Sequence, residues 1–284
     1  MRLLPLLFAA LTSGCSLLGD GTSLSVGTFN AGLLRRGRAL PPKGEGYVIP
    51  ALWRARNARY GTDELTDAIA RAARRVRREY PGGTLGVADL SVRGGGASPL
   101  HRSHNNGRDA DLIWYAVDAR DRPVAPADAM PRYGPDLVAR APRPTDGVVF
   151  GPFSPRRFDV RRNWALVRAL LQDPFIDVQY LFCNERLKQL MLEHARSIGE
   201  DVDLLDRAVA LLHQPGDSLP HDDHLHLRIF CSATDRVYGC LDRGPVRWWK
   251  KRWKYMAPDR PVDASALLAR LVVQPYAGGR HVVP

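Results

Sequence analysis

The sequence predicts an α+β protein with a largely antiparallel sheet and flanking helices. Length and composition indicate a globular chain, and the mixture of elements indicates the class. The chain has 284 residues, which is enough for one large or two small domains. Its composition, 45% hydrophobic and 25% charged, is typical of globular proteins and argues against a disordered, collagen-like or polytopic membrane chain. Segments of helical and strand periodicity are mixed without strict β-α-β alternation.

Helices are expected where apolar residues recur at helical spacing between a cap and a stop. The first starts after the cap residue Thr62, has Asp63 and Glu64 in its first turn, and stops at the Pro-Gly-Gly of residues 81–83. Further helices are expected at 162–171, 185–198 and 202–213. Period-two alternation with β-branched and aromatic residues predicts strands at 85–92, 110–117, 147–150, 176–182 and 224–230.

Residues 1–15 are expected to be an export signal. Arg2 precedes a short apolar run, far below the roughly 20 residues of a membrane-spanning helix. Leu11-Thr-Ser-Gly-Cys15 resembles a lipobox, in which Cys15 becomes the lipidated first residue of the mature chain. The alternative is simple secretion. We expect a periplasmic protein anchored to the outer membrane through Cys15, with the small, Gly-rich residues 16–27 as a tether.

The chain is strongly basic, with 41 Lys and Arg against 30 Asp and Glu and a net charge of +11. Such a charge suits an anionic partner, which could be nucleic acid, a membrane surface or a carboxylate-rich polymer. Arginines on the first helix could bind phosphate, but a solvated helix face is the usual reason for their spacing. Residues 246–284 form a basic, aromatic extension that is either a binding surface or a strap over the domain. The arginine cluster on the first helix carries no base-reading motif, and nucleic acid is not an expected partner.

Export to an oxidising compartment permits a disulfide. Of the four cysteines, three follow the signal. Cys231 and Cys240 are nine residues apart, and Asp235 and Gly239 can turn the chain between them. We therefore expect these two to pair and Cys183 to stay free; the alternative is three buried thiols.

Histidines are the most informative residues, because five of the eight fall into two clusters. In the first, His101 and His104 lie on a loop, and Gly107 turns the chain into a strand. On that strand Asp109 and Asp111 share one face. Asp111 can therefore point to the place that His104 faces.

The second cluster consists of His221, His224 and His226. Alternation along the predicted strand puts His224, His226 and Arg228 on one face, with apolar residues on the core face. Two imidazoles two residues apart on a strand lie about 6 to 7 Å from each other.

Together the clusters predict a metal site. Zinc in hydrolases typically takes three protein ligands and leaves a fourth position for water. His104, Asp111 and His226 would supply such a set, with His224 beside it as a base. Imidazole and carboxylate also accept iron, copper or manganese, and the alternative to a metal is a buried polar network or scattered surface histidines.

The clusters also resemble a known family. His-x6-Asp followed by His-x-His is the zinc signature of the LAS metallopeptidases. The longer forms His-x-x-His-x6-Asp and His-x-x-His-x-His resemble the penicillin-insensitive murein endopeptidases of the MepA type. The resemblance covers roughly residues 28–245 and includes Gly-Gly-Gly at 94–96, Arg162-Asn-Trp164 and a cysteine pair after the last histidine. The residues that form the two patterns are His101, His104, Asp111, His221, His224 and His226.

This resemblance implies a LAS-type zinc peptidase domain at 28–245. Such an enzyme cuts peptide cross-links in peptidoglycan, typically between D-alanine and meso-diaminopimelate. The resemblance makes His224 the general base and gives His221 an assisting role. It implies that His101 lines the site or assists the metal. The zinc ligands that it implies are His104, Asp111 and His226.

Other interpretations stay open. Asp223 lies three residues before His226, where carboxypeptidase relatives place a carboxylate base, although alternation would turn it towards the core unless the strand begins at His224. A D,D-carboxypeptidase acting on stem peptides would need a cation that grips a free carboxylate, and Arg108 or Arg228 could serve. A non-catalytic cell-wall binding module would keep the fold but lack metal affinity.

Overall fold

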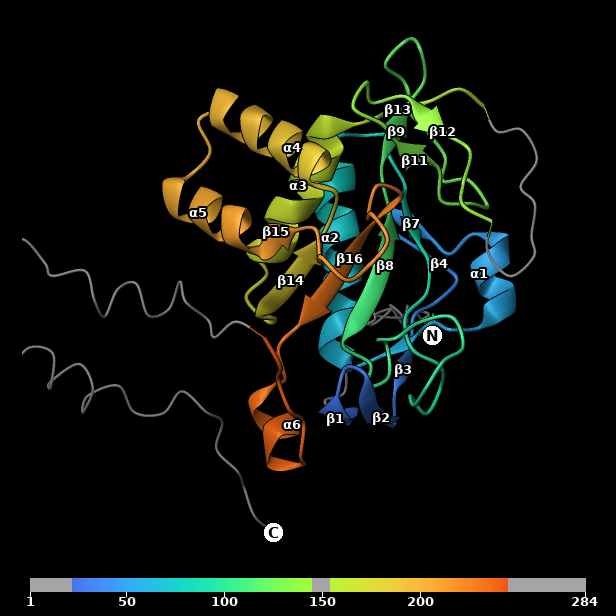
Figure 1. Cartoon of the computed structure of the whole chain (residues 1–284), viewed down its shortest axis with the longest axis vertical. Helices are drawn as coiled ribbons and strands as arrows, with labels where there is room; N and C mark the ends of the chain where they lie inside the picture. Colours follow the sequence, from blue (N-terminus) through green and yellow to red (C-terminus); the bar gives the residue numbers. More distant parts are fainter. Residues whose placement is uncertain (1–21, 145–153, 245–284) are drawn as a thin grey trace, which may run out of the picture. The chain divides into compact units, whose positions relative to one another are not determined.

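A seven-stranded sheet forms the centre of the protein in the computed structural model, which describes residues 22–144 and 154–244 (Figure 1). The strand order is β15-β14-β16-β8-β7-β5-β4. Pairing is antiparallel except between β14 and β15 and between β5 and β7, which confirms the expected α+β class with a mostly antiparallel sheet. The strands are β4 (Lys43–Gly44), β5 (Tyr47–Val48), β7 (Leu85–Val87), β8 (Asp109–Ile113), β14 (Val178–Phe182), β15 (Leu212–His213) and β16 (His224–Ile229).

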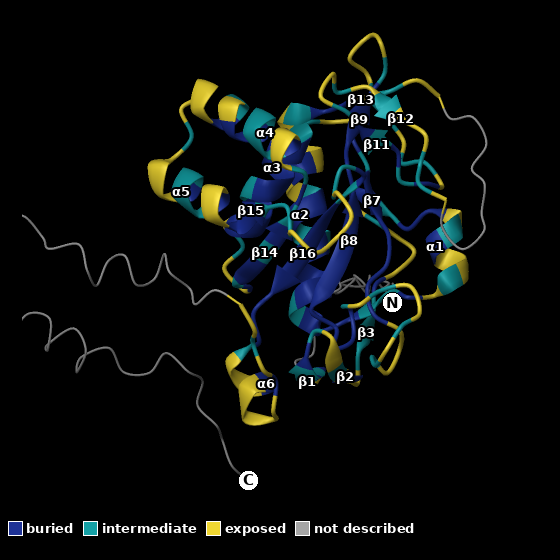
Figure 2. Cartoon of the chain, viewed as in Figure 1, coloured by how far each residue is buried: buried dark blue, intermediate teal, exposed yellow. Residues whose placement is uncertain are grey.

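Helices pack beside and behind this sheet. In Figure 1, α2 runs behind β16 and β8, and α2 also contacts α3. The outward sides of α4 and α5 are exposed, whereas β8 and β16 are almost wholly buried (Figure 2). None of the helices in the described ranges has the length and apolarity needed to cross a membrane. The helices are α1 (Ala51–Arg56), α2 (Asp63–Glu79), α3 (Val160–Leu171), α4 (Glu185–Ser197), α5 (Val202–Leu211) and α6 (Ala233–Val237).

The four expected helices are present, with small changes at their ends. Thr62 caps α2 as expected, since its side chain accepts a hydrogen bond from the Leu65 N–H. α3 begins two residues early because Asp159 caps it. α5 ends at Leu211 because the next two residues form the edge strand β15.

Most of the observed strands are shorter than the apolar runs that predicted them. The run at 85–92 pairs as a strand only over β7, and the run at 110–117 divides into β8 and the short strand β9. β14 begins two residues late, and β16 matches its prediction closely. The expected strand at 147–150 lies outside the described residues.

Short strands complete the described fold around the sheet. They form two-stranded pairs β1–β2, β3–β6 and β11–β12 and the three-stranded sheet β10-β9-β13. Their bounds are β1 (Leu24–Thr28), β2 (Ala31–Arg35), β3 (Arg38–Ala39), β6 (Tyr60–Gly61), β9 (Ala116–Val117), β10 (Pro123–Val124), β11 (Arg132–Tyr133), β12 (Ala139–Arg140) and β13 (Arg157–Phe158).

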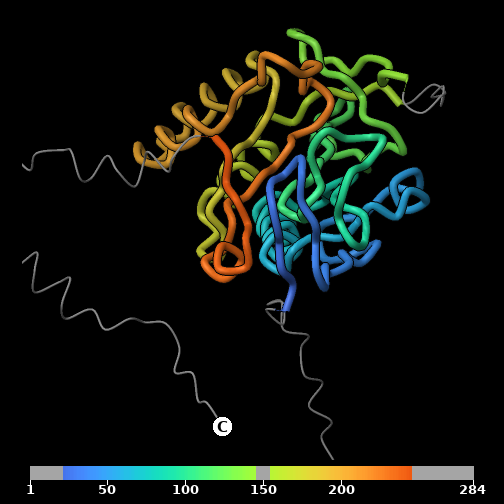
Figure 3. The backbone as a smooth tube through the Cα atoms, turned by 60° about the horizontal axis from the view of Figure 1, so that its bottom comes forward, coloured from blue at the N-terminus to red at the C-terminus, as the bar shows by residue number. Residues whose placement is uncertain are grey.

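The expected tether at 16–27 is wrong for its last four residues, because they belong to β1. The β1–β2 hairpin lies beside the chain around α6, as the blue and orange-red segments of Figure 3 show. The Gly27 N–H donates to the Gly239 carbonyl at 2.9 Å, and the Ser25 N–H donates to Asp235 at 3.0 Å. Composition does not indicate such long-range hydrogen bonds, and a segment rich in glycine and other small residues is therefore predicted to be a linker.

The expected disulfide is present. Cys231 and Cys240 are bonded, with their Cα atoms 6.0 Å apart, and α6 lies between them. Cys183 is free and buried. The compact unit that contains these elements ends at Gly244, and the C-terminal extension at 246–284 and the signal at 1–15 lie outside the described residues.

Candidate metal centre

The register between β8 and β16 brings the two histidine clusters together. His226 pairs with Asp111, and Arg228 pairs with Asp109. Because alternate residues of paired strands share one face, these four side chains project to the same side of the sheet. The apolar partners between them, such as Leu225 and Leu227, are fully buried on the other side.

His101 and His104 approach from the loop before β8. His104 has a left-handed backbone with a φ of 68°, and its carbonyl accepts a hydrogen bond from the Ser91 hydroxyl. Gly107 then turns the chain with a φ of 79°. A Cβ at Gly107 would lie 2.6 Å from the Leu34 side chain, so this turn tolerates only glycine without a shift.

One carboxylate oxygen is the meeting point of the cluster. The Oδ1 atom of Asp111 lies 3.0 Å from Nδ1 of His226, 3.4 Å from Nε2 of His104 and 3.4 Å from Nε2 of His224. Two groups of three residues could each hold a metal ion, because within each group the ligand atoms lie within 4.8 Å of one another. These groups are His101, His104 and Asp111, and His221, His224 and His226.

The outer nitrogens of His104 and His226 are held by the protein. His104 donates from Nδ1 to the Leu90 carbonyl at 3.1 Å, and His226 donates from Nε2 to Asp109 at 2.8 Å. The opposite nitrogen of each ring therefore faces Asp111. This arrangement is typical of metal-binding histidines, whose second nitrogen bonds to a carbonyl or carboxylate.

The free atoms of the cluster fit a cation. Asp111 Oδ1 and His104 Nε2 are both buried and have no hydrogen-bond partner among the residues described. Burial alone would raise the pKa of Asp111, but the His104 and His224 side chains lower it well below its usual value. A cation bound between these two atoms would pair both of them and offset the charge of the buried carboxylate.

Asp109 is a residue of the site to which the sequence analysis gave no role. Its carboxylate is fully buried and accepts from Arg228 Nε at 2.6 Å as well as from His226. Burial raises its pKa, yet Arg228 and His226 outweigh burial and lower the pKa below its usual value. The available signal was its position two residues before Asp111 on the same strand face.

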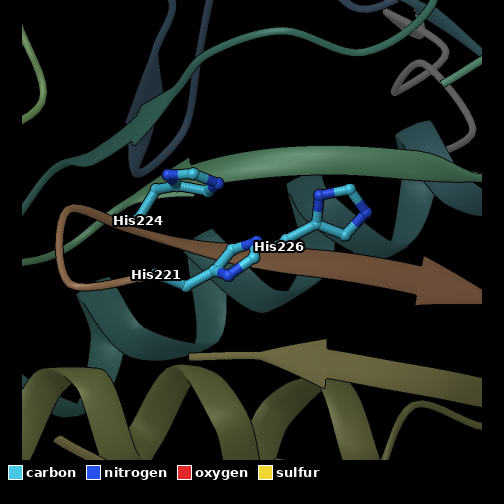
Figure 4. Close-up of side chains that lie close together, drawn as sticks. All are labelled: His221, His224 and His226. Atoms are coloured by element: carbon cyan, nitrogen blue, oxygen red, sulfur yellow. The ribbon is translucent and has the colours of Figure 1, made fainter. Parts of the chain in front are cut away.

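His224 and His221 lie at the start of β16 and in the loop before it, and His226 lies further along the strand (Figure 4). The His224 side chain is 17% exposed, compared with 1% for His104 and 7% for His226. Burial lowers the pKa of His224, but the carboxylates of Asp111 and Asp223 raise it to about 10 in the absence of metal. Burial and the neighbouring histidines lower the pKa of His221 to about 3.

The other two candidate residues, His101 and Asp223, lie at the edge of the cluster. His101 contacts Asp89 at 3.0 Å and reaches Asp111 Oδ2 only at 3.8 Å. Asp223 does not enter the core: β16 begins at His224, so strand alternation does not extend to Asp223, which bonds to His224 at 2.7 Å.

Neither arginine considered as a carboxylate clamp is free. Arg108 is fully buried and donates to the Ile229 carbonyl and to Asp242 at 2.8 and 2.9 Å. Arg228 is held by Asp109, and its guanidinium lies 3.6 Å from the ring centre of Phe29. The expectation that either could grip a substrate carboxylate is wrong, because the guanidinium group of each arginine is already paired within the protein.

Comparison with known proteins places the chain in a family. The model of the family described as penicillin-insensitive murein endopeptidase matches residues 25–247. The chain belongs to this family. It is also similar to the penicillin-insensitive murein endopeptidase of Haemophilus influenzae, with 30% identity over 231 residues, which are 80% of this chain and 70% of that protein.

Membership of the murein endopeptidase family agrees with the cluster in two ways. The family is one of metallopeptidases, and the matched residues include both histidine clusters. The chain is therefore a member of a peptidoglycan-hydrolysing family with a His/Asp cluster suited to a metal.

The contact between Asp109 and His226 leads to a prediction. Asp109→Asn keeps the shape but removes the charge that orients His226, and we expect the affinity for zinc to fall about 10- to 100-fold. Competition with a chromogenic chelator measures this change. The control is Asp173→Asn, which alters a buried carboxylate paired with Arg71 on other elements and should leave the affinity unchanged. Equal affinities of the Asp109→Asn and wild-type proteins would contradict the role.

Proposed function

We propose that the chain is a zinc metalloendopeptidase with a LAS-type core that hydrolyses peptide cross-links in peptidoglycan at the bond from D-alanine to meso-diaminopimelate. The observation that carries this proposal is the convergence of three imidazole nitrogens on the buried Asp111 Oδ1 atom, in a chain of the murein endopeptidase family. The proposed zinc ligands are His104, Asp111 and His226.

Burial and orientation support this choice of ligands over the group of His221, His224 and His226. His104 and His226 are the least exposed imidazoles of the cluster, and each is fixed through its outer nitrogen. Two histidines and one carboxylate, with room for water, form a common ligand set of hydrolytic zinc. Bound zinc would lower the pKa of a water molecule to about 7 and polarise the scissile carbonyl.

In the proposed mechanism His224 is the general base. Its Nε2 atom faces Asp111, and its side chain is more accessible than those of the proposed ligands. Bound zinc would offset the charge of Asp111, which raises the pKa of His224 in the metal-free protein, so that His224 would be neutral. It would then take a proton from the attacking water at Nε2 and return it to the amine that leaves. His221, kept neutral by its low pKa, donates an N–H to the negative charge that develops on the carbonyl oxygen.

The surroundings of the cluster favour an endopeptidase over a carboxypeptidase. A carboxypeptidase needs a cation that binds the free end of its substrate, and the two arginines considered for this task are buried and paired. The net charge of +11 favours approach to peptidoglycan, whose stem peptides carry carboxylates. A binding module without catalysis would not need the buried, unpaired ligand atoms.

Digestion of purified muropeptides tests the bond that is cut. We expect cross-linked dimers to become monomers, with no release of D-alanine from uncross-linked pentapeptides. Mass spectrometry of the products distinguishes the two reactions, and the Asp111→Ala protein is the inactive control. Release of D-alanine from pentapeptides, with dimers intact, would instead support the carboxypeptidase.

The proposed location is the periplasm, with a lipid anchor at Cys15 in the outer membrane. The signal and Cys15 lie outside the described residues, so this proposal depends on the lipobox-like sequence and on the cell-wall substrate of the family. We expect the wild type to fractionate with membranes and Cys15→Ser to lose this association. A soluble wild type with a cleaved, unacylated terminus would contradict the anchor.

A further inference from the structure

A row of charged side chains continues from His224 away from Asp111. His224 Nδ1 lies 2.7 Å from Asp223 Oδ1, and the other oxygen of Asp223 accepts from Arg143 Nη1 at 2.5 Å. Arg143 also donates from Nη2 to Asp222 at 2.6 Å. The Tyr133 N–H donates to the Asp222 carbonyl at 2.9 Å, which ties β11 to the same loop. Arg143 follows β12, so a distant segment of the chain supports the start of β16.

We propose that Asp223 and Arg143 are positioning residues that keep a proton on Nδ1 of His224 and so direct its Nε2 atom to the reaction centre. This inference rests on the proposed function insofar as His224 is the base. It changes the role of Asp223 from the alternative base, considered from the sequence, to a residue that acts through His224.

The donor and acceptor chemistry supports this role. An ionised carboxylate only accepts hydrogen bonds, and the Arg143 ion pair favours the ionised form of Asp223. The Nδ1 atom of His224 must therefore be the donor. In neutral imidazole the other nitrogen is then an acceptor, which is what a base needs at Nε2. Nε2 is also the atom that faces Asp111.

The same contacts argue against Asp223 as the base. Both of its oxygens are engaged, one by His224 and the other by Arg143. The Asp223 and Arg143 side chains are only 11% and 22% exposed, so water screens this ion pair less than an exposed one. Asp223 is therefore placed to orient a neighbour instead of receiving a proton from a substrate water.

Asp223→Asn is the decisive variant. Arg143 offers only donors, so the single amide oxygen should turn to Arg143 and leave the amide NH2 facing Nδ1 of His224. The proton would then move from Nδ1 to Nε2. We expect kcat to fall at least about 100-fold with KM within about 3-fold of wild type and zinc content unchanged, because the base is misdirected while the ligands stay.

Nuclear magnetic resonance on ¹⁵N-histidine-labelled protein gives a readout that does not depend on activity. We expect a low-field Nδ1–H signal from His224 in the wild type, both metal-free and zinc-loaded, assigned by its absence in His224→Gln. Asp223→Asn should lose this signal, whereas Asp223→Glu should restore part of both the signal and kcat. Circular dichroism shows whether each variant is folded.

Two further variants complete the test. Asp217→Asn makes the same change at an exposed position in the preceding loop and should keep kcat and the signal. Arg143→Ala leaves the carboxylate in place and should lower kcat by a smaller factor, about 10-fold. Wild-type kcat in Arg143→Ala would overturn the part assigned to Arg143.

Other results separate this inference from the proposed function. The role of Asp223 would be overturned by any of three results in a folded Asp223→Asn protein. These are an unchanged Nδ1–H signal, a kcat within about 3-fold of wild type, and a loss of zinc. A wild type that shows the signal, loses it in Asp223→Asn and yet cuts no cross-links would contradict the proposed function while supporting the hydrogen bond.

Discussion

Asp111→Ala is expected to abolish both stoichiometric zinc binding and the hydrolysis of cross-links. The substitution removes the oxygen that lies within 3.0 to 3.4 Å of nitrogens from His104, His224 and His226. Without it, two imidazoles are left to hold the ion, and no ionised carboxylate offsets its charge. No other single change should have a larger effect.

Metal analysis after equilibration with zinc, together with the muropeptide assay, measures this result. His104→Ala and His226→Ala should behave in the same way, since each removes one of the three proposed ligands. His194→Ala is the control, because His194 lies on α4 and should leave zinc and activity intact. Circular dichroism should show that all variants are folded. Stoichiometric zinc in Asp111→Ala would refute the proposed ligand set.

His224→Ala is expected to keep zinc and to lose turnover by at least about 100-fold, the usual contribution of a positioned base. The His224 side chain is more accessible than those of His104 and His226, and these two ligands do not depend on it for their orientation. Retained zinc with lost kcat therefore separates a base from a ligand.

Measurement of zinc content and of kcat on muropeptide dimers checks this expectation. His213→Ala, which removes an imidazole from the edge strand β15, is the control and should keep both. If His224→Ala loses zinc, His224 is a ligand, and the identity of the base must be sought elsewhere. If it keeps full turnover, the proposed proton transfer is wrong.

Local patterns predicted much of the fold because the elements themselves are local. The cap at Thr62 and the acidic first turn identified α2, and alternation identified β16 almost to the residue. Local patterns gave a wrong prediction where a long-range contact determined the secondary structure of a segment. Residues 24–27 look like a linker, but they pair with β2 and bond to the loop after α6.

The sequence by itself determined which residues could form the site. Alternation placed His224, His226 and Arg228 on one strand face and Asp109 with Asp111 on another. The motif spacing identified the family, which the match over residues 25–247 confirmed. These inferences succeed because side-chain direction along one strand depends only on the backbone repeat.

Only the tertiary structure decided which of those residues contact one another, and therefore which role each can have. The pairing of β8 with β16 sets His226 beside Asp111, and no periodicity within either strand specifies that register. Packing between distant segments also pairs Arg108 and Arg228 with other groups, so that neither can bind a substrate carboxylate. It places Asp109 beside His226 and Arg143 beside Asp223. The physical reason is that a charged side chain takes its role from the partner it meets, and those partners lie up to 134 residues away in the chain.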